Sequence, residues 1–180
     1  MEKVVSRVRS WATFLAVVTL AASGLVGMAG SSRADIEQQN CTGTWSVNYD
    51  PPITNTPTTT NVKVTGYFFT CTNLLAPSGA YEQTFTDTVS CTQLLLSGAT
   101  SRTYRWSNPA VEPSTFSYNW TVTRTGGQTV ITNSGLITSG TFASASAQQV
   151  TALVTPDSLQ CAGTGVSSLT GPSTLVVLGL

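Results

Sequence analysis

The chain has 180 residues, with 8 basic and 8 acidic side chains, four cysteines and no histidine. From Asp35 onward seven acids outnumber four bases, a net charge of −3. This balance disfavours nucleic acid and anionic membranes as partners, because both require clustered positive charge. The lack of histidine excludes Ser-His-Asp and Cys-His catalysis within this chain.

The first segment, residues 1–34, has the pattern of a secretory signal peptide. A basic start is followed by the uncharged stretch Ser10–Ser32 and by small residues up to Ala34, after which cleavage is expected. This predicts a secreted, extracellular protein with one domain over residues 35–180. The alternative is an uncleaved anchor, since about 20 uncharged residues can cross a bilayer. Only in that case would a membrane be a partner.

Beyond the signal, period-two alternation of apolar and polar residues predicts short strands. The clearest run is 114–124, where large aromatics alternate with polar residues. Gly126-Gly127 then predicts a two-residue hairpin turn. The following run, 129–142, is interpreted as two short strands around Asn133–Gly135. Further strands are expected at 41–49, 60–70, 81–91, 101–106, 148–155 and 174–179.

Eight to ten short strands, with turn signals about every 8–12 residues, predict an all-β fold. The expected architecture is an antiparallel β-sandwich of the immunoglobulin-like, Greek-key type, or a partly open barrel.

The four cysteines indicate disulfides, because an even number in an exported chain is typical of a disulfide framework. If the runs on either side of "PPITNTPTTT" form a hairpin, Cys41 and Cys71 lie opposite each other, equidistant from residue 56. Three pairings are possible in principle. The hairpin favours Cys41–Cys71, which leaves Cys91–Cys161. The cysteine spacing does not suit zinc, and no metal or cofactor is expected.

Two aromatic faces are candidates for stacking on a ligand. Arg102, Tyr104 and Trp106 share one face, and the arginine suggests partial exposure, so these three are the possible ligand contacts. The face of Phe116–Trp120 is expected in the core instead, because a chain with few large residues needs them there.

Carboxylates offer an alternative chemistry. Glu82 and Asp87 fall on opposite faces of one strand, and Asp87 shares the apolar face, which indicates a strand end, a bulge or an edge position. A carboxylate-dependent hydrolase would require two acids close together in a cleft. The candidates are Asp50, Glu82, Asp87, Glu112 and Asp157.

Three segments carry a family resemblance: "CTGTWSVNYDPPITNTPTTTNVKVTGYFFTC", "FSYNWTVTRTGGQTVITNSGLITSGTFASASA" and "DSLQCAGTGVSSLTGPSTLVVL". Together they resemble a group of small secreted actinobacterial proteins that are Thr-rich, carry four cysteines and are of unassigned function. The resemblance implies export and a β-rich fold, and it implies no activity.

These patterns predict a secreted, non-enzymatic binding or structural module of the extracellular space or cell surface. Its ligand is expected to be a glycan, a wall polymer or a protein. The alternatives are the carboxylate-dependent hydrolase and an inhibitor that presents the loop 108–114.

Overall fold

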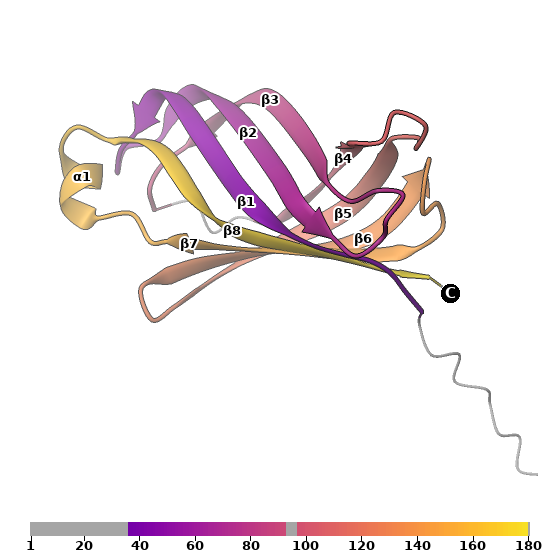
Figure 1. Cartoon of the computed structure of the whole chain (residues 1–180). Coiled ribbons are helices and arrows are strands. Elements are labelled where there is room, and N and C mark those ends of the chain that lie inside the picture. The colour runs from indigo at the N-terminus through magenta and orange to yellow at the C-terminus, as the bar shows by residue number, and fades with distance from the viewer. Residues whose placement is uncertain (1–35, 93–96, 180) are drawn as a thin grey trace, which may run out of the picture. The chain divides into compact units, whose positions relative to one another are not determined.

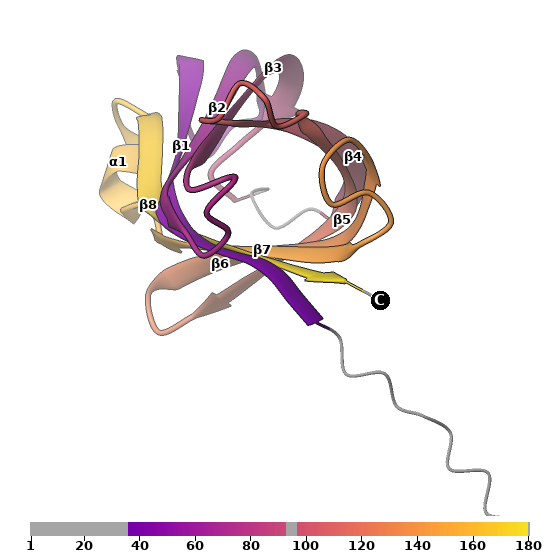
Figure 2. The same cartoon turned by 45° about the vertical axis from the view of Figure 1, so that its right-hand side comes forward.

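The computed structural model describes residues 36–92 and 97–179, with side chains from residue 38 onward. The predicted signal segment therefore lies outside the described residues. The described chain forms eight antiparallel strands in sequential order, closed into a barrel by pairing of the last strand with the first (Figures 1 and 2). The elements are β1 (Ile36–Ile53), β2 (Thr58–Cys71), β3 (Gly79–Val89), β4 (Gly98–Trp106), β5 (Ser114–Thr125), β6 (Gln128–Ser139), β7 (Ser146–Val154), α1 (Ser158–Ala162) and β8 (Val166–Gly179).

The prediction of an all-β fold is confirmed, and that of a sandwich or partly open barrel is wrong. Closure rests on the β1–β8 ladder, which joins Ile36 to Gly179 and continues, with two irregularities, to Ile53 and Val166. Alternation along a strand reports only that one face is buried. Sandwiches and barrels share that pattern, so local sequence could not reveal which strands pair at the two ends of the chain.

The hairpin of β1 and β2 has the predicted register at its open end, and the ladder shifts by one residue between Thr42 and Gly43. Cys41 lies opposite Cys71 and the two form a disulfide. The turn occupies residues 54–57, so β1 extends further than expected and includes Pro51 and Pro52. Neither proline is paired in the β1–β2 or β1–β8 ladder, in agreement with the missing N–H donor of proline.

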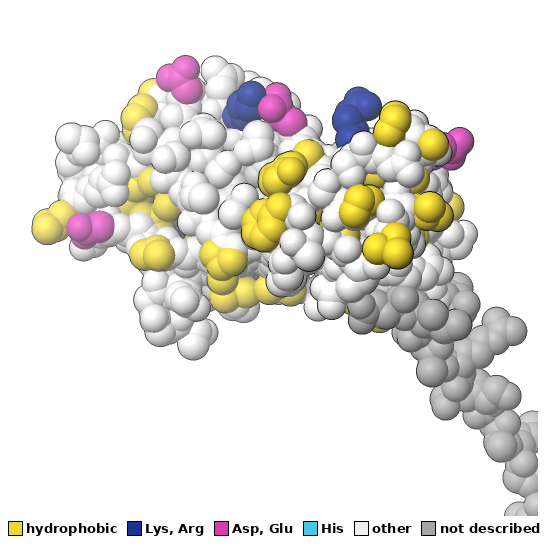
Figure 3. Space-filling model, viewed as in Figure 1, with side chains coloured by type: hydrophobic (Ala, Val, Ile, Leu, Met, Phe, Trp, Pro, Cys, Tyr) yellow, Lys and Arg dark blue, Asp and Glu magenta, His cyan; other side chains and the backbone are white. Residues whose placement is uncertain are grey.

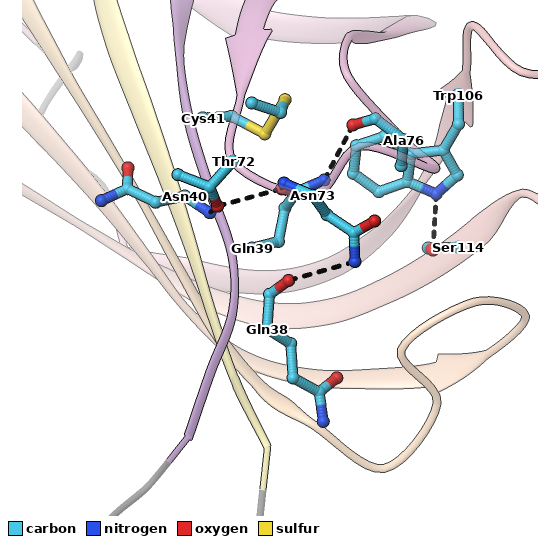
Figure 4. The surroundings of a disulfide bond; sticks show 10 residues. Gln38, Gln39, Asn40, Cys41, Thr72, Asn73, Ala76, Trp106 and Ser114 are labelled. Atoms are coloured by element: carbon cyan, nitrogen blue, oxygen red, sulfur yellow. Dashed lines mark hydrogen bonds between the residues drawn. A yellow bond between two sulfur atoms is a disulfide. The ribbon is translucent and has the colours of Figure 1, made fainter.

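The loop between β2 and β3 folds over the barrel end beside this disulfide (Figure 4). The buried Gln39 side chain holds it: Nε2 donates to the carbonyl of Ala76 at 2.9 Å, and Oε1 accepts from the amide of Asn73 at 2.8 Å. Nearby, Trp106 Nε1 donates to Ser114 Oγ at 2.9 Å. Polar groups that face the interior at this end are thus paired, and the loop packs tightly against the barrel.

At the other end, the second disulfide joins Cys91, just after β3, to Cys161 in α1. This confirms the predicted pairing. The Gly126-Gly127 hairpin is also confirmed, with φ angles of 59° and 78°. The predicted break at Asn133–Gly135 is wrong, because β6 runs through it while paired on both sides. β8 starts at Val166, earlier than expected.

Candidate functional site

The barrel wall has a weak seam between β3 and β4. Their ladder contains only two partner pairs, Gly79–Trp106 and Ala80–Arg105, although β3 continues for nine residues beyond Ala80. Past these pairs the strands are bridged by the side chain of Gln83, whose Nε2 donates to the carbonyl of Ser101 at 2.6 Å. The seam thus interrupts the backbone hydrogen bonding of an otherwise continuous wall.

Residues along the unpaired part of β3 have the exposure that an interrupted ladder predicts. Phe85 is opposite the buried Val62 and therefore shares the inward face of the sheet, yet it is 47% exposed. Asp87 is likewise opposite the buried Thr60 and is exposed. Because β3 lacks its β4 partner here, Asp87 occupies an edge position, as the sequence indicated.

A hollow of about 780 Å³ lies over the seam, within the range of small-molecule sites. Most of its lining side chains are hydroxyl-bearing, amide or charged. It is lined by Thr44, Ser46, Thr65, Gly66, Tyr67, Ala80, Tyr81, Glu82, Gln83, Thr84, Ser101, Arg102, Thr103 and Arg105. On the face that Figure 3 presents, the dark-blue Lys and Arg groups lie near the upper edge, whereas the magenta Asp and Glu groups are spread across it.

Arg102 points into the barrel and is 8% exposed. Its Nη1 donates to the Tyr81 hydroxyl at 2.6 Å and to Gln149 Oε1 at 2.9 Å. Its Nε donates to the Tyr118 hydroxyl at 2.9 Å, and Nη2 donates to the same oxygen. The guanidinium carbon also lies 4.4 Å from the ring centroids of both tyrosines. The cation is therefore fixed by phenols and an amide.

The surrounding tyrosines do not neutralise this charge. Burial raises the pKa of Tyr81 and raises that of Tyr104 well above its ordinary value, although the Arg102 charge opposes both shifts. Both hydroxyls are therefore protonated at neutral pH. Burial lowers the pKa of Arg102, but the tyrosines outweigh it and the net direction is upward. The site accordingly contains a buried, permanently charged guanidinium.

The three predicted ligand contacts do share one face, but that face is the barrel interior. Tyr104 is fully buried and Trp106 is 7% exposed. The expected partial exposure is wrong for both. The Arg102 side chain is hydrogen-bonded inside the barrel, so the face that it shares with Tyr104 and Trp106 is the buried one. Tyr104 packs against Phe68, Tyr81 and Phe116, with ring centroids 5.4–5.9 Å apart.

The second aromatic face is in the core, as predicted. Phe116 is fully buried and Tyr118 is 5% exposed, and their rings stack with centroids 4.8 Å apart. Trp120 is partly buried against them.

The candidate acids are not gathered at the hollow. Among the described residues, Glu82 is the hollow's one carboxylate, and it pairs with Lys63 at 3.0 Å. Asp157 accepts from the amide of Leu159 and caps α1. Asp50 lies in β1, Asp87 lies further along β3, and Glu112 lies in the β4–β5 loop. The carboxyl pair that the hydrolase hypothesis requires is not assembled in this hollow.

The loop 108–114 is a compact turn. The amide of Val111 donates to the carbonyl of Asn108 at 3.0 Å, and Val111 packs against the core.

Comparison with protein-family models, curated proteins and solved structures finds no match for this chain. None of the described helices has the length and apolar character needed to cross a membrane. The two disulfides are compatible with an extracellular protein.

Sequence reasoning missed the seam and the hollow, including Gly66, Gln83 and Tyr67. One signal was available: Asp87 interrupts the apolar face of its strand, which marked the unpaired part of β3.

Proposed function

We propose that this protein is a secreted, non-enzymatic binding module whose ligand is a small polar molecule held in the hollow over the β3–β4 seam. The observation that carries the proposal is the hollow itself, about 780 Å³ in volume and lined mainly by hydroxyl, amide and charged groups. Such groups supply directional hydrogen bonds, which select polar ligands over apolar ones.

The walls of the hollow suit a hydroxyl-bearing ligand. Six lining residues are threonine or serine, and each hydroxyl can both donate and accept. Tyr67 adds an aromatic residue that is 54% exposed. A ring face next to hydroxyl groups complements a sugar, which has apolar C–H faces and polar edges. This supports the glycan among the ligand classes expected from the sequence.

The binding experiment is isothermal titration calorimetry with glucose, N-acetylglucosamine, glucuronate, acetate and glycine. We expect at least one probe to bind, and the Thr103→Trp variant to abolish that binding by filling the hollow. Thr121→Trp is the matched control, because Thr121 is an exposed threonine on β5 and is not among the lining residues. Absence of binding by every probe, or equal binding to both tryptophan variants, would overturn the proposal.

The predicted secretion and signal cleavage are tested separately from ligand binding. N-terminal sequencing of protein from the culture medium should begin at Asp35, whereas an intact Met1 recovered in a membrane fraction would contradict secretion.

A further inference from the structure

The charged residues of the chain are unevenly distributed. Three of the four bases from Asp35 onward, namely Lys63, Arg102 and Arg105, lie in the hollow or form an ion pair with one of its residues. Glu82 neutralises one of the three, which leaves a local charge of +2 in a chain segment whose net charge is −3. A positive hollow in an acidic chain favours a negatively charged ligand.

No carboxylate among the described side chains forms an ion pair with Arg102. Among the described side chains, residues 38–92 and 97–179, its hydrogen-bond partners are two phenols and an amide. Asp87, which shares the inward face, lies six residues from Tyr81 along β3, about 20 Å at the rise of a strand. An uncompensated buried cation is costly, and an anion seated beside it would offset that cost.

The Arg102 guanidinium also has a donor that no described acceptor uses. A guanidinium has five N–H donors, and four are used, two by Nη1, one by Nε and one by Nη2. One Nη2 proton is left without an acceptor in the described part of the chain.

Tyr81 contributes a second spare donor. Its oxygen already accepts from Arg102 and from Gln149 Nε2 at 2.9 Å, which fills both lone pairs. Its own hydroxyl proton has no acceptor among the described residues. Arg102 and Tyr81 both line the hollow, so a ligand oxygen that reaches inward through the seam would meet these two unused donors.

We infer that the ligand carries an anionic oxygen group, a carboxylate or related oxyanion, that docks against the Arg102 guanidinium and the Tyr81 hydroxyl, with Arg105 at the rim. This inference rests on the proposed function, because it specifies the chemistry of the ligand in the same hollow. The oxyanion can belong to a free small acid or to an acidic sugar, and both present the same acceptor oxygens.

The test compares sodium glucuronate with glucose, which differ at the carboxylate, by calorimetry at one ionic strength. Acetate, sulfate and tetra-galacturonate are added to separate free acids from acidic sugars. We expect glucuronate to bind at least about tenfold more tightly than glucose, the value of one charge-assisted hydrogen bond. If the ligand is an acidic sugar, acetate and sulfate should bind much more weakly than glucuronate and tetra-galacturonate. If acetate and sulfate bind as tightly as glucuronate, the oxyanion alone is recognised and the ligand is a free acid.

Variants then locate the anion. Arg102→Lys keeps the charge but loses the planar fork, and should weaken glucuronate about tenfold or more while glucose is unaffected. Because a change at a buried residue can impair folding, Tyr81→Phe and Arg105→Gln provide milder variants with the same expected direction. Arg124→Gln is the matched control. Arg124 is the one base from Asp35 onward that does not belong to this group, so its replacement removes the same charge and should leave the affinity for glucuronate unchanged.

Glucose bound as tightly as glucuronate, with both lost in Thr103→Trp, would overturn this inference and leave the proposed function standing. Equal weakening by Arg105→Gln and Arg124→Gln would also overturn it, because it would indicate general charge attraction. If no probe binds the wild-type protein, both proposals fail.

Discussion

Inside the barrel, the guanidinium of Arg102 donates to the hydroxyl of Tyr81 over 2.6 Å, and both residues line the hollow over the seam between β3 and β4. The two strands meet at this point: the ladder ends one residue before Tyr81, at the pair Ala80–Arg105. The interruption of the ladder therefore lies beside a charged group that is itself buried in the barrel.

The seam should be visible in native-state hydrogen exchange. We expect those amides of Glu82–Val89 and Gly98–Tyr104 that face the gap to exchange rapidly, because no ladder partner protects them. Amides of β1 and β8, which pair along nearly their whole length, should exchange far more slowly. Mass-spectrometric or NMR exchange measurements provide the comparison, and slow exchange on both sides of the seam would contradict the broken ladder.

Gly66 provides the space for the Tyr81 ring. A Cβ at this position would lie 2.1 Å from Tyr81 Cε1, so Gly66→Ala must displace the ring that binds Arg102. We expect a loss of about 1–3 kcal/mol in the free energy of unfolding from overpacking, together with weaker glucuronate binding. Denaturant unfolding and calorimetry measure the two effects.

Gly98→Ala is the matched control for that variant. Its added Cβ would lie 2.3 Å from the Trp120 ring, so it should lower stability similarly. Because Trp120 is not among the residues lining the hollow, binding should persist. Equal loss of binding in both variants would indicate a general effect of destabilisation.

The two disulfides should contribute unequally to stability. Cys41–Cys71 closes a separation of 30 residues and Cys91–Cys161 one of 70. Chain entropy then predicts about 3.6 and about 4.4 kcal/mol respectively. Unfolding of the two double-serine variants should show the larger loss for Cys91–Cys161, and the reverse order would contradict this prediction.

Stability should fall at alkaline pH through Tyr49. Burial raises the pKa of Tyr49 from 10.0 to about 12, so the folded state retains this proton more tightly than the unfolded state. The contribution of Tyr49 to the free energy of unfolding is complete below pH 10. It is lost as the pH rises through 12, at up to about 1.4 kcal/mol per pH unit.

Urea unfolding between pH 9 and pH 12 measures this dependence, with Tyr49→Phe as the comparison. In the variant, the free energy of unfolding should fall less steeply with pH, by the amount that corresponds to one proton fewer released on unfolding. Parallel slopes for the two proteins would exclude Tyr49 as a source, since Tyr81 and Tyr104 titrate in both.

Local chemistry made several parts of this structure predictable. Alternation located most strands, Gly126-Gly127 fixed a hairpin, and the symmetry of Cys41 and Cys71 fixed a disulfide. Alternation also placed Arg102, Tyr104 and Trp106 on one face. It could not say which face, because the usual exposure of arginine is overridden when Tyr81, Tyr118 and Gln149, distant in sequence, supply its partners.

Closure of the barrel could not be predicted either, because it also depends on residues that are distant in sequence. The pairing of β1 with β8 joins the two ends of the described chain, and neither strand signals its partner. The hollow depends on a ladder that stops after two pairs, which is a tertiary feature that strand propensity does not encode.

The most direct measurement is an NMR titration of arginine-labelled protein with sodium glucuronate, monitored at the guanidinium Nε–H and Nη–H resonances. Binding should shift the Arg102 resonances saturably, with a smaller change at Arg105 and none at Arg124, and glucose should leave all of them in place. Unchanged Arg102 resonances at saturating glucuronate, or equal shifts at all three arginines, would contradict an oxyanion seated on Arg102.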